Sequence, residues 1–226
     1  MKKLILLCFI LLTVSCGEKK VVQLPEIKNS KITEVNDISH AYLFFNESMP
    51  DSVELNRKNL ISTTNWLINV DKRLTLKQVM PQIKFLQDKK NNSSHKNENA
   101  KNYFTCHNTS RNDLGFLEFT DVVYQLSDSI GSFKEFNTLW DNSKLEIYVE
   151  SLNKITFAGS TPNNALEITN IQNLNKTLND FSSLNIQRIS INVKQSLTFQ
   201  DYITVKSILE NIGMWQNLID ENEFIY

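Results

Sequence analysis

The chain has 226 residues, of which 41% are hydrophobic and 22% charged, and its formal net charge is −1. The length leaves room for one large domain or two small ones, and the apolar fraction excludes a disordered chain. Three cysteines exclude a dense disulfide scaffold, the near-zero charge argues against a nucleic-acid-binding protein, and neither Gly-rich phosphate-binding motif (GxGxxG or GxxxxGKS/T) is present.

The first fifteen residues have the layout of a secretory signal peptide. Two lysines follow the initiator Met, and the run Leu4–Val14 is apolar apart from Thr13. This run of about eleven residues is well short of the roughly twenty that a helix needs to span a bilayer. We therefore expect a cleaved leader rather than a transmembrane anchor.

The sequence LTVSC, which ends at Cys16, resembles a bacterial lipobox, with Ser15 and Cys16 in the usual places and Thr13 where Leu is common. The resemblance implies that residues 1–15 are a lipoprotein signal peptide and that the Cys16 thiol is acylated after cleavage. Acyl chains would hold the protein on a membrane, because each buried CH₂ contributes about 0.8 kcal/mol. The alternative is an ordinary signal peptide that is cut nearby. The polar residues 16–33 are expected to form a tether.

Five elements are predicted between residues 34 and 131: two β-like runs, a helix, a strand and a second helix. They are expected, in that order, at residues 41–48, 60–70, 74–88, 103–107 and 114–126. Pro81 lies inside the first of these helices, where it should kink the helix or mark its first turn. The polar stretch 89–102 is expected to be a mobile surface loop inserted between helix and strand.

The same order of elements is predicted between residues 144 and 226. The elements are expected at residues 144–151, 154–158, 171–184, 188–193 and 197–209. Thr198 and Asp201 look like the capping box of the last helix, and this helix aligns without gaps with residues 114–126. The sequence therefore predicts an α+β fold of two tandem two-layer sandwich units, each β-β-α-β-α, at 34–131 and 144–226, with a linker at 132–143.

The second unit resembles the periplasmic domain of the ExbD/TolR family, and residues 40–130 resemble it more faintly. Four positions in the segment 202–213 match the last helix of the family pattern, namely Tyr202, Val205, Leu209 and Gly213. The resemblance implies a non-catalytic envelope domain that docks to a protein by edge-strand pairing or binds peptidoglycan. Family members carry a transmembrane helix with an ionisable Asp for proton-driven motors, whereas residues 1–15 contain no Asp. Proton coupling is therefore not part of the expectation.

Few residues are candidates for chemistry. Cys106 and His107 could pair as nucleophile and base, but neighbours in a strand point to opposite faces. Apart from the acylated Cys16, Cys106 is the one thiol of the mature chain, so it has no intrachain disulfide partner. His40 and His95 are distant in sequence from His107, so we expect no metal site and no cofactor.

The remaining candidates are interpreted as structural. The acidic residues are expected on solvated helix faces and caps, and Glu47 and Glu150 at strand ends. Trp66, Trp140 and Trp215 are expected to pack, with Trp66 half-buried and the other two between the units; binding by an exposed Trp is the alternative. The sequence contains no GxSxG, SxxK or HExxH motif.

These observations favour a non-catalytic lipoprotein of the bacterial envelope that faces the periplasm. Its expected partners are the membrane, through Cys16, and an envelope protein or peptidoglycan; a homodimer through sheet edges is a further option. The alternative functions are an envelope hydrolase on an unrecognised fold, which would need a pocket lined by acids or by Cys106 with a nearby His, and a purely structural spacer between membrane and cell wall.

Overall fold

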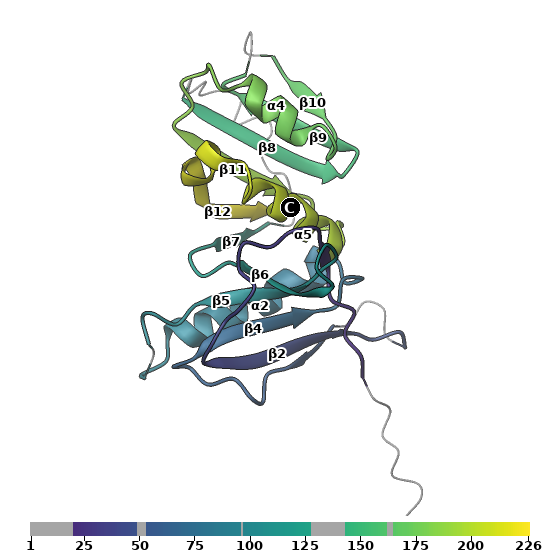
Figure 1. Ribbon diagram of the computed structural model, residues 1–226, viewed down its shortest axis with the longest axis vertical. Helices are drawn as coiled ribbons and strands as arrows, with labels where there is room; N and C mark the ends of the chain where they lie inside the picture. Colours follow the sequence, from purple (N-terminus) through teal and green to yellow (C-terminus); the bar gives the residue numbers. More distant parts are fainter. Residues whose placement is uncertain (1–19, 49–52, 96, 128–142, 162–164) are drawn as a thin grey trace, which may run out of the picture.

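The computed structural model describes residues 20–48, 53–95, 97–127, 143–161 and 165–226. The expected signal peptide, Cys16 and nearly all of the expected linker lie outside the described residues. Within them the fold is mixed α/β, with two sheets and three α-helices. Figure 1 shows the second sheet stacked above the first along the long axis of the molecule.

The first sheet has a parallel centre and antiparallel additions. Its strands are β1 (Glu26–Ile27), β2 (Ile38–Phe45), β3 (Val53–Asn56), β4 (Asn65–Val70), β5 (Asn102–Asn108) and β6 (Asp113–Glu118). β4 pairs in parallel with β2 and β5, while β3 and β6 pair antiparallel with β2 and β5. β4 is apolar over most of its length and buried on both faces, as is typical of a central parallel strand.

The second sheet has the order β10-β9-β8-β11-β12-β7. Its strands are β7 (Val123–Leu126), β8 (Lys144–Ser151), β9 (Lys154–Gly159), β10 (Glu167–Thr169), β11 (Arg188–Val193) and β12 (Ile219–Ile225). β8, β11, β12 and β7 are parallel neighbours, and β9 and β10 follow as antiparallel strands at one end. β7 was expected in the first unit, but it pairs with β12, so the boundary at residue 131 does not separate the two sheets.

The helices start at capping residues that the chain supplies locally. α2 (Leu76–Asn91) and α5 (Phe199–Leu209) both begin after a Thr that forms a capping box, and the box predicted from Thr198 and Asp201 is confirmed. α4 (Leu174–Asp180) is shorter, and a 3-10 helix follows α5 at Gly213–Leu218. The buried sides of α2 and α5 join a single apolar cluster that includes strands of both sheets.

The helix predicted over residues 114–126 is wrong. Residues 113–118 form β6 and residues 123–126 form β7. β5 and β6 are joined by a tight turn in which Asn112 has a φ of 53°, a left-handed conformation that Asn tolerates. Pairing with the open edge of β5 therefore stabilises residues 113–118 as a strand more than their apolar spacing stabilises a helix. Gly115 further lowers the helix propensity of this segment.

The described part of the expected tether packs on the first sheet. β1 pairs in parallel with β5, and Ile27 is buried. Further along, Ile32 forms a bridge with Phe116 of β6, and the Phe116 amide donates to the Ile32 carbonyl oxygen at 3.0 Å. The expected tether was too long, because apolar residues in this stretch find an open sheet surface to cover.

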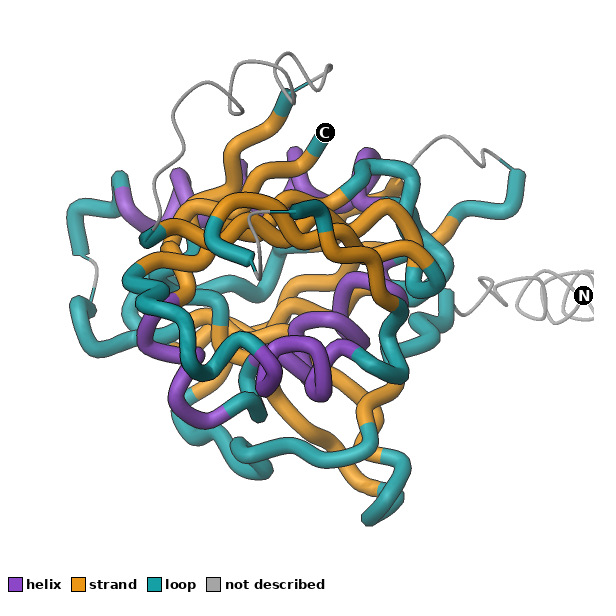
Figure 2. The backbone as a smooth tube through the Cα atoms, turned by 90° about the horizontal axis from the view of Figure 1, so that it is seen from above, coloured by secondary structure: helices purple, strands orange, loops and turns teal. Residues whose placement is uncertain are grey.

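The two halves share part of a common order rather than the same complete order. The second half contains β8, β9, α4, β11 and α5, as expected, together with β10 and β12. In the first half β2, β4, α2 and β5 occupy the places of the first four expected elements, with β3 in addition, but strands β6 and β7 stand where the last helix was expected. The structural counterpart of α5 is α2. Figure 2 shows strands of the two sheets overlying one another, with helices on either side.

The ends of the expected insert 89–102 are ordered parts of the fold. α2 continues to Asn91, and β5 begins at Asn102. Lys90 is buried, donates to the Asn102 side-chain oxygen at 2.9 Å, and lies over the Trp66 ring. Burial lowers the pKa of Lys90 to about 8. The segment expected to be a surface loop is therefore shorter than the sequence suggested.

Candidate functional site

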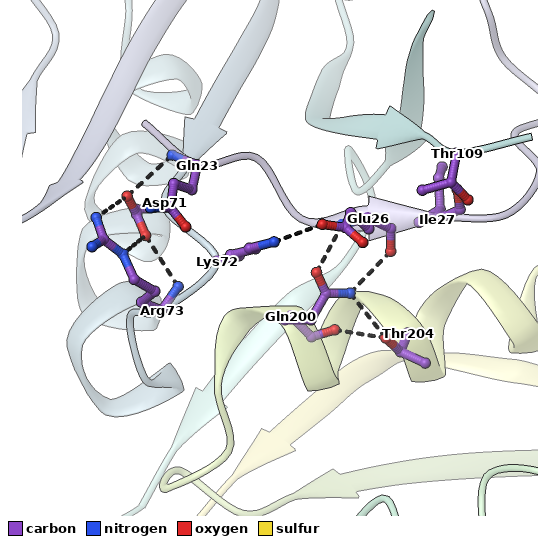
Figure 3. Close-up of polar contacts among 9 residues, drawn as sticks. All are labelled: Gln23, Glu26, Ile27, Asp71, Lys72, Arg73, Thr109, Gln200 and Thr204. Carbon is purple, nitrogen blue, oxygen red and sulfur yellow. Dashed lines mark hydrogen bonds and ion pairs between the residues drawn. The ribbon is translucent and has the colours of Figure 1, made fainter. Parts of the chain in front are cut away.

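The segment that follows residue 20 ties the two halves of the molecule together. The Glu26 amide donates to the Gln200 side-chain oxygen at 2.8 Å, and the Gln200 side-chain nitrogen donates back to the Glu26 carbonyl oxygen at 2.9 Å. Lys72 pairs with the Glu26 carboxylate at 2.6 Å. Figure 3 shows this group, in which the N-terminal segment lies between the end of β4 and α5.

A buried carboxylate fixes the same segment to the end of β4. Asp71 is buried and accepts hydrogen bonds from Arg73 Nε at 2.8 Å and from the Gln23 amide at 3.1 Å (Figure 3). Burial opposes the charged carboxylate, but these hydrogen bonds outweigh it, and the pKa of Asp71 lies below its usual value. The segment therefore enters the fold at Gln23 with little freedom.

An open cleft of about 610 Å³ lies beside this entry point, at the carboxyl ends of β2 and β4. Its lining includes Phe44 from β2 and four charged side chains. These charges are paired: Lys20 with Glu54, and Arg73 with Glu47 at 3.1 Å. Because the charged side chains of the described lining are paired and stand beside exposed apolar groups, the cleft offers an amphipathic surface.

The far end of the molecule presents an edge strand with exposed apolar side chains. β10 pairs with β9 on one side and has no strand on its other side among the described residues. Leu166 is 64% exposed and Ile168 is 60% exposed, while Thr169 bonds to Thr177 of α4 at 3.0 Å. The edge is thus held in place by the helix but leaves backbone groups and two apolar side chains open.

The structure separates Cys106 from His107. The Cys106 side chain is fully buried, and burial, reinforced by Glu210, raises its thiol pKa. His107 is partly exposed and lies 3.1 Å from the Asn112 side-chain oxygen. The two side chains therefore do not form a nucleophile–base pair, as the strand geometry indicated.

The other sequence candidates lie apart from one another. His40 stacks beside Tyr42 on β2, and His95 is exposed after α2. Among the described residues, no three His, Cys, Asp or Glu side chains are grouped so as to hold a metal ion. Glu150 pairs with Lys154 at the β8–β9 turn, in keeping with its expected place at a strand end, as Glu47 is at the end of β2.

The tryptophans that the structure describes are not exposed. Trp66 was expected to be half-buried, but it is fully buried and its indole nitrogen donates to the Ile61 carbonyl oxygen at 2.7 Å. Trp215 is also buried, and Trp140 lies outside the described residues. Binding through an exposed Trp66 or Trp215 is therefore excluded.

No local pattern in the sequence indicates the buried polar network that links the second sheet to α5. The Tyr124 and Tyr202 hydroxyls lie 3.1 Å apart, Tyr202 donates to the Glu223 carboxylate at 2.7 Å, and Lys206 pairs with the same carboxylate. Glu223 is fully buried in β12, so these donors satisfy a charge that would otherwise be costly. The network joins β7, α5 and β12, which are separated in sequence.

Comparisons of the chain with protein-family models, with curated proteins and with solved structures found no match. No helix in the described part of the chain is long and apolar enough to cross a membrane.

Proposed function

We propose that this chain is a non-catalytic lipoprotein of the bacterial envelope that binds a partner protein while acylated Cys16 holds it on a membrane. The observation that carries the binding role is the open edge of β10. Its unpaired backbone groups match another extended polypeptide, and the exposed Leu166 and Ile168 supply apolar area next to them.

The position of β10 supports this role. Figure 1 places β10 at one end of the long axis and β2 of the first sheet at the other. The described chain begins at Lys20, which pairs with Glu54 of β3 in the first sheet. An anchor at Cys16 would therefore leave β10 on the side of the molecule that is far from the anchor, where a partner can reach it.

A relation to the ExbD/TolR family is part of the proposal. The order β8, β9, α4, β11 and α5 in the second half supports it, because these elements occupy the places that the sequence resemblance assigned. In that case the chain would act in a biopolymer-transport system without proton coupling. The first half, in which strands β6 and β7 stand where the last helix was expected, supports the relation less.

Binding is favoured over the alternative of an envelope hydrolase. Cys106 is buried and lies apart from His107, and the acids of the open cleft, Glu47 and Glu54, are both engaged with basic side chains. A hydrolase would need an accessible nucleophile or two carboxylates that flank a substrate. The accessible edge of β10 supports a binding role.

Photocrosslinking in living cells tests the proposal. A benzophenone amino acid in place of Ile168 should give a discrete crosslinked species with a second protein, whereas the same replacement at Phe85, which is 44% exposed on α2, should not. No adduct at residue 168, or adducts of equal yield at both positions, would contradict binding at β10. Sedimentation of the soluble domain with purified peptidoglycan would assign the partner to the cell wall instead, and a crosslinked homodimer would assign it to a second copy.

A further inference from the structure

We infer that the face around Lys20, Val21 and Phe44 rests on the phospholipid bilayer surface. The inference depends on the proposed anchor at Cys16, and it adds which side of the protein meets the membrane. Its basis is the short chain between Cys16 and the folded body, together with the chemistry of the face where that chain enters.

The chain between the anchor and the fold has little reach. Three residues separate Cys16 from Lys20, and the four steps from one Cα to the next span at most about 14 Å when the chain is fully extended. An acylated Cys16 lies at the membrane interface, because its acyl chains are inserted in the hydrocarbon. Lys20 must therefore stay close to the lipid headgroups whatever path residues 17–19 take.

The body cannot move away from Lys20 without breaking contacts. Lys20 pairs with Glu54 of β3, and three residues later the Gln23 amide donates to buried Asp71. The Lys72 amide also donates to the Gln23 carbonyl oxygen at 2.8 Å. These contacts therefore hold the cleft side of the first sheet close to the anchor.

The exposed groups on this side suit a lipid headgroup layer. Val21 is 70% exposed, and the half-exposed rings of His40, Tyr42 and Phe44 follow one another along β2, with centroids 5.9–6.0 Å apart. Aromatic side chains are favoured at the interface between water and hydrocarbon. The charges of the neighbouring cleft are paired, as described above, so Glu47 and Glu54 present no unpaired acid to an anionic surface.

The arrangement orients the whole molecule. β2 lies at the end of the long axis opposite β10 (Figure 1). If the β2 side rests on lipid, β10, with the exposed Ile168, lies at the end of the molecule away from the bilayer. The same orientation keeps the proposed binding edge clear of the membrane.

Spin labelling of the full-length protein tests the inference. The acylated chain would be purified from cell membranes and reconstituted in vesicles of phosphatidylethanolamine and phosphatidylglycerol, with a nitroxide on a Cys at position 21 (Val21→Cys) or 44 (Phe44→Cys). Ile168→Cys serves as the distal control. The introduced thiol is the one that reacts, because Cys16 is acylated and Cys106 is buried with a raised pKa.

The expected result is a severalfold loss of accessibility to a water-soluble nickel chelate at residues 21 and 44 on reconstitution, and no change at residue 168. Equal accessibility at all three positions would overturn the inference. Shielding that depends on protein concentration and occurs without vesicles would also overturn it, because a second copy would then cover the face. The mass of the N-terminal peptide is measured first: an unacylated Cys16 would refute the proposed anchor itself, which distinguishes the two failures.

Discussion

Thr75 and Thr198 face each other in an isolated antiparallel bridge at the junction of the two halves. Around them the backbone contacts are reciprocal: the Leu76 amide donates to the Leu197 carbonyl oxygen at 2.9 Å, and the Phe199 amide donates to the Leu74 carbonyl oxygen at 2.7 Å. A carbonyl oxygen of each half therefore accepts a hydrogen bond from the first amide of the other half's helix, α2 or α5. A helix has no internal acceptor for the amides of its first turn, so these contacts satisfy groups that would otherwise lack a partner in the helix.

The same relationship extends into the strands before the helices. β4 ends with Ile68-Asn69-Val70, and β11 ends with Ile191-Asn192-Val193 at the same distance before the capping Thr. Both strands are the parallel neighbours of a long first strand, β2 or β8. The corresponding order of strand, capped helix and strand supports a duplicated ancestor, although the repeat lies on different elements from those that the sequence alignment paired.

Loss of the capping side chain on α5 should measurably weaken the fold. Thr198→Ala removes the hydroxyl that accepts from the Asp201 amide at 3.1 Å and should lower the free energy of unfolding by about 1 kcal/mol. Thr198→Ser, which keeps the hydroxyl, should retain most of the stability. Urea unfolding of both variants checks this, and equal stability of Thr198→Ala and the parent protein would show that the cap contributes nothing.

Gln200 should hold the N-terminal segment to α5. Gln200→Ala removes both of its hydrogen bonds to Glu26, and we expect faster hydrogen exchange of the Glu26 amide and a loss of about 1 kcal/mol in stability. Gln172→Ala, at an exposed position, is the matched control and should change neither quantity. Unchanged exchange at Glu26 in the Gln200 variant would mean that the segment is held by its other contacts alone.

Gly115 should control the contact between β6 and the segment that covers it. A Cβ added at Gly115 would lie 2.6 Å from the Ser30 Cβ, which is too close. Gly115→Ala should therefore displace Ser30 and Ile32 and expose this stretch to limited proteolysis. Addition of Ser30→Gly to the variant should restore part of the resistance: it removes the colliding Cβ, but it also removes the hydroxyl that donates to the Ile32 carbonyl oxygen at 2.6 Å. Failure of this second change to restore resistance would place the damage elsewhere in β6.

Glu210 should make stability fall as the pH rises through the weakly acidic range. Burial raises the pKa of Glu210 from 4.5 to about 7; Lys206 and Lys31 act against the shift, and Glu118 and Glu223 add to it. Because the folded protein holds this proton more tightly than the unfolded chain does, the stability that the proton contributes is lost as the pH rises from 4.5 to about 7.

The Glu210→Gln variant tests this dependence. It should be more stable than the parent protein at pH 8, and the difference should shrink toward zero near pH 4, as measured by thermal unfolding. Glu221→Gln, at an exposed position of β12, should follow the parent curve. A pH profile of Glu210→Gln that parallels the parent profile would assign the dependence to other groups.

Sequence patterns correctly predicted the elements whose local signals agree with their tertiary surroundings. The helix after Thr198 was predicted because the cap, the acid in the first turn and the apolar spacing all agree, and β11 because its alternation is clear. β12 was missed, since a strand with three acidic residues shows no apolar pattern. Only the long-range partners of Glu223, Lys206 and Tyr202, make its burial possible.

The candidate surfaces were harder to predict than the elements. Glu26 and Gln200 carry no motif, and their contact depends on how the two halves stack. The cleft beside Lys20 likewise joins side chains from separate strands. The general idea of docking at a sheet edge came from the family resemblance, but the choice of β10 depends on exposures that no local pattern reports.

The intact mass of the protein purified from cell membranes tests the central claim, that acylated Cys16 anchors this chain on a membrane, most directly. We predict a mature chain that begins at Cys16 and carries acyl groups, and we expect a Cys16→Ser variant to lack that added mass and to leave the membrane fraction. A leader cut at another bond, or an unmodified Cys16 in protein that still sediments with membranes, would contradict the claim.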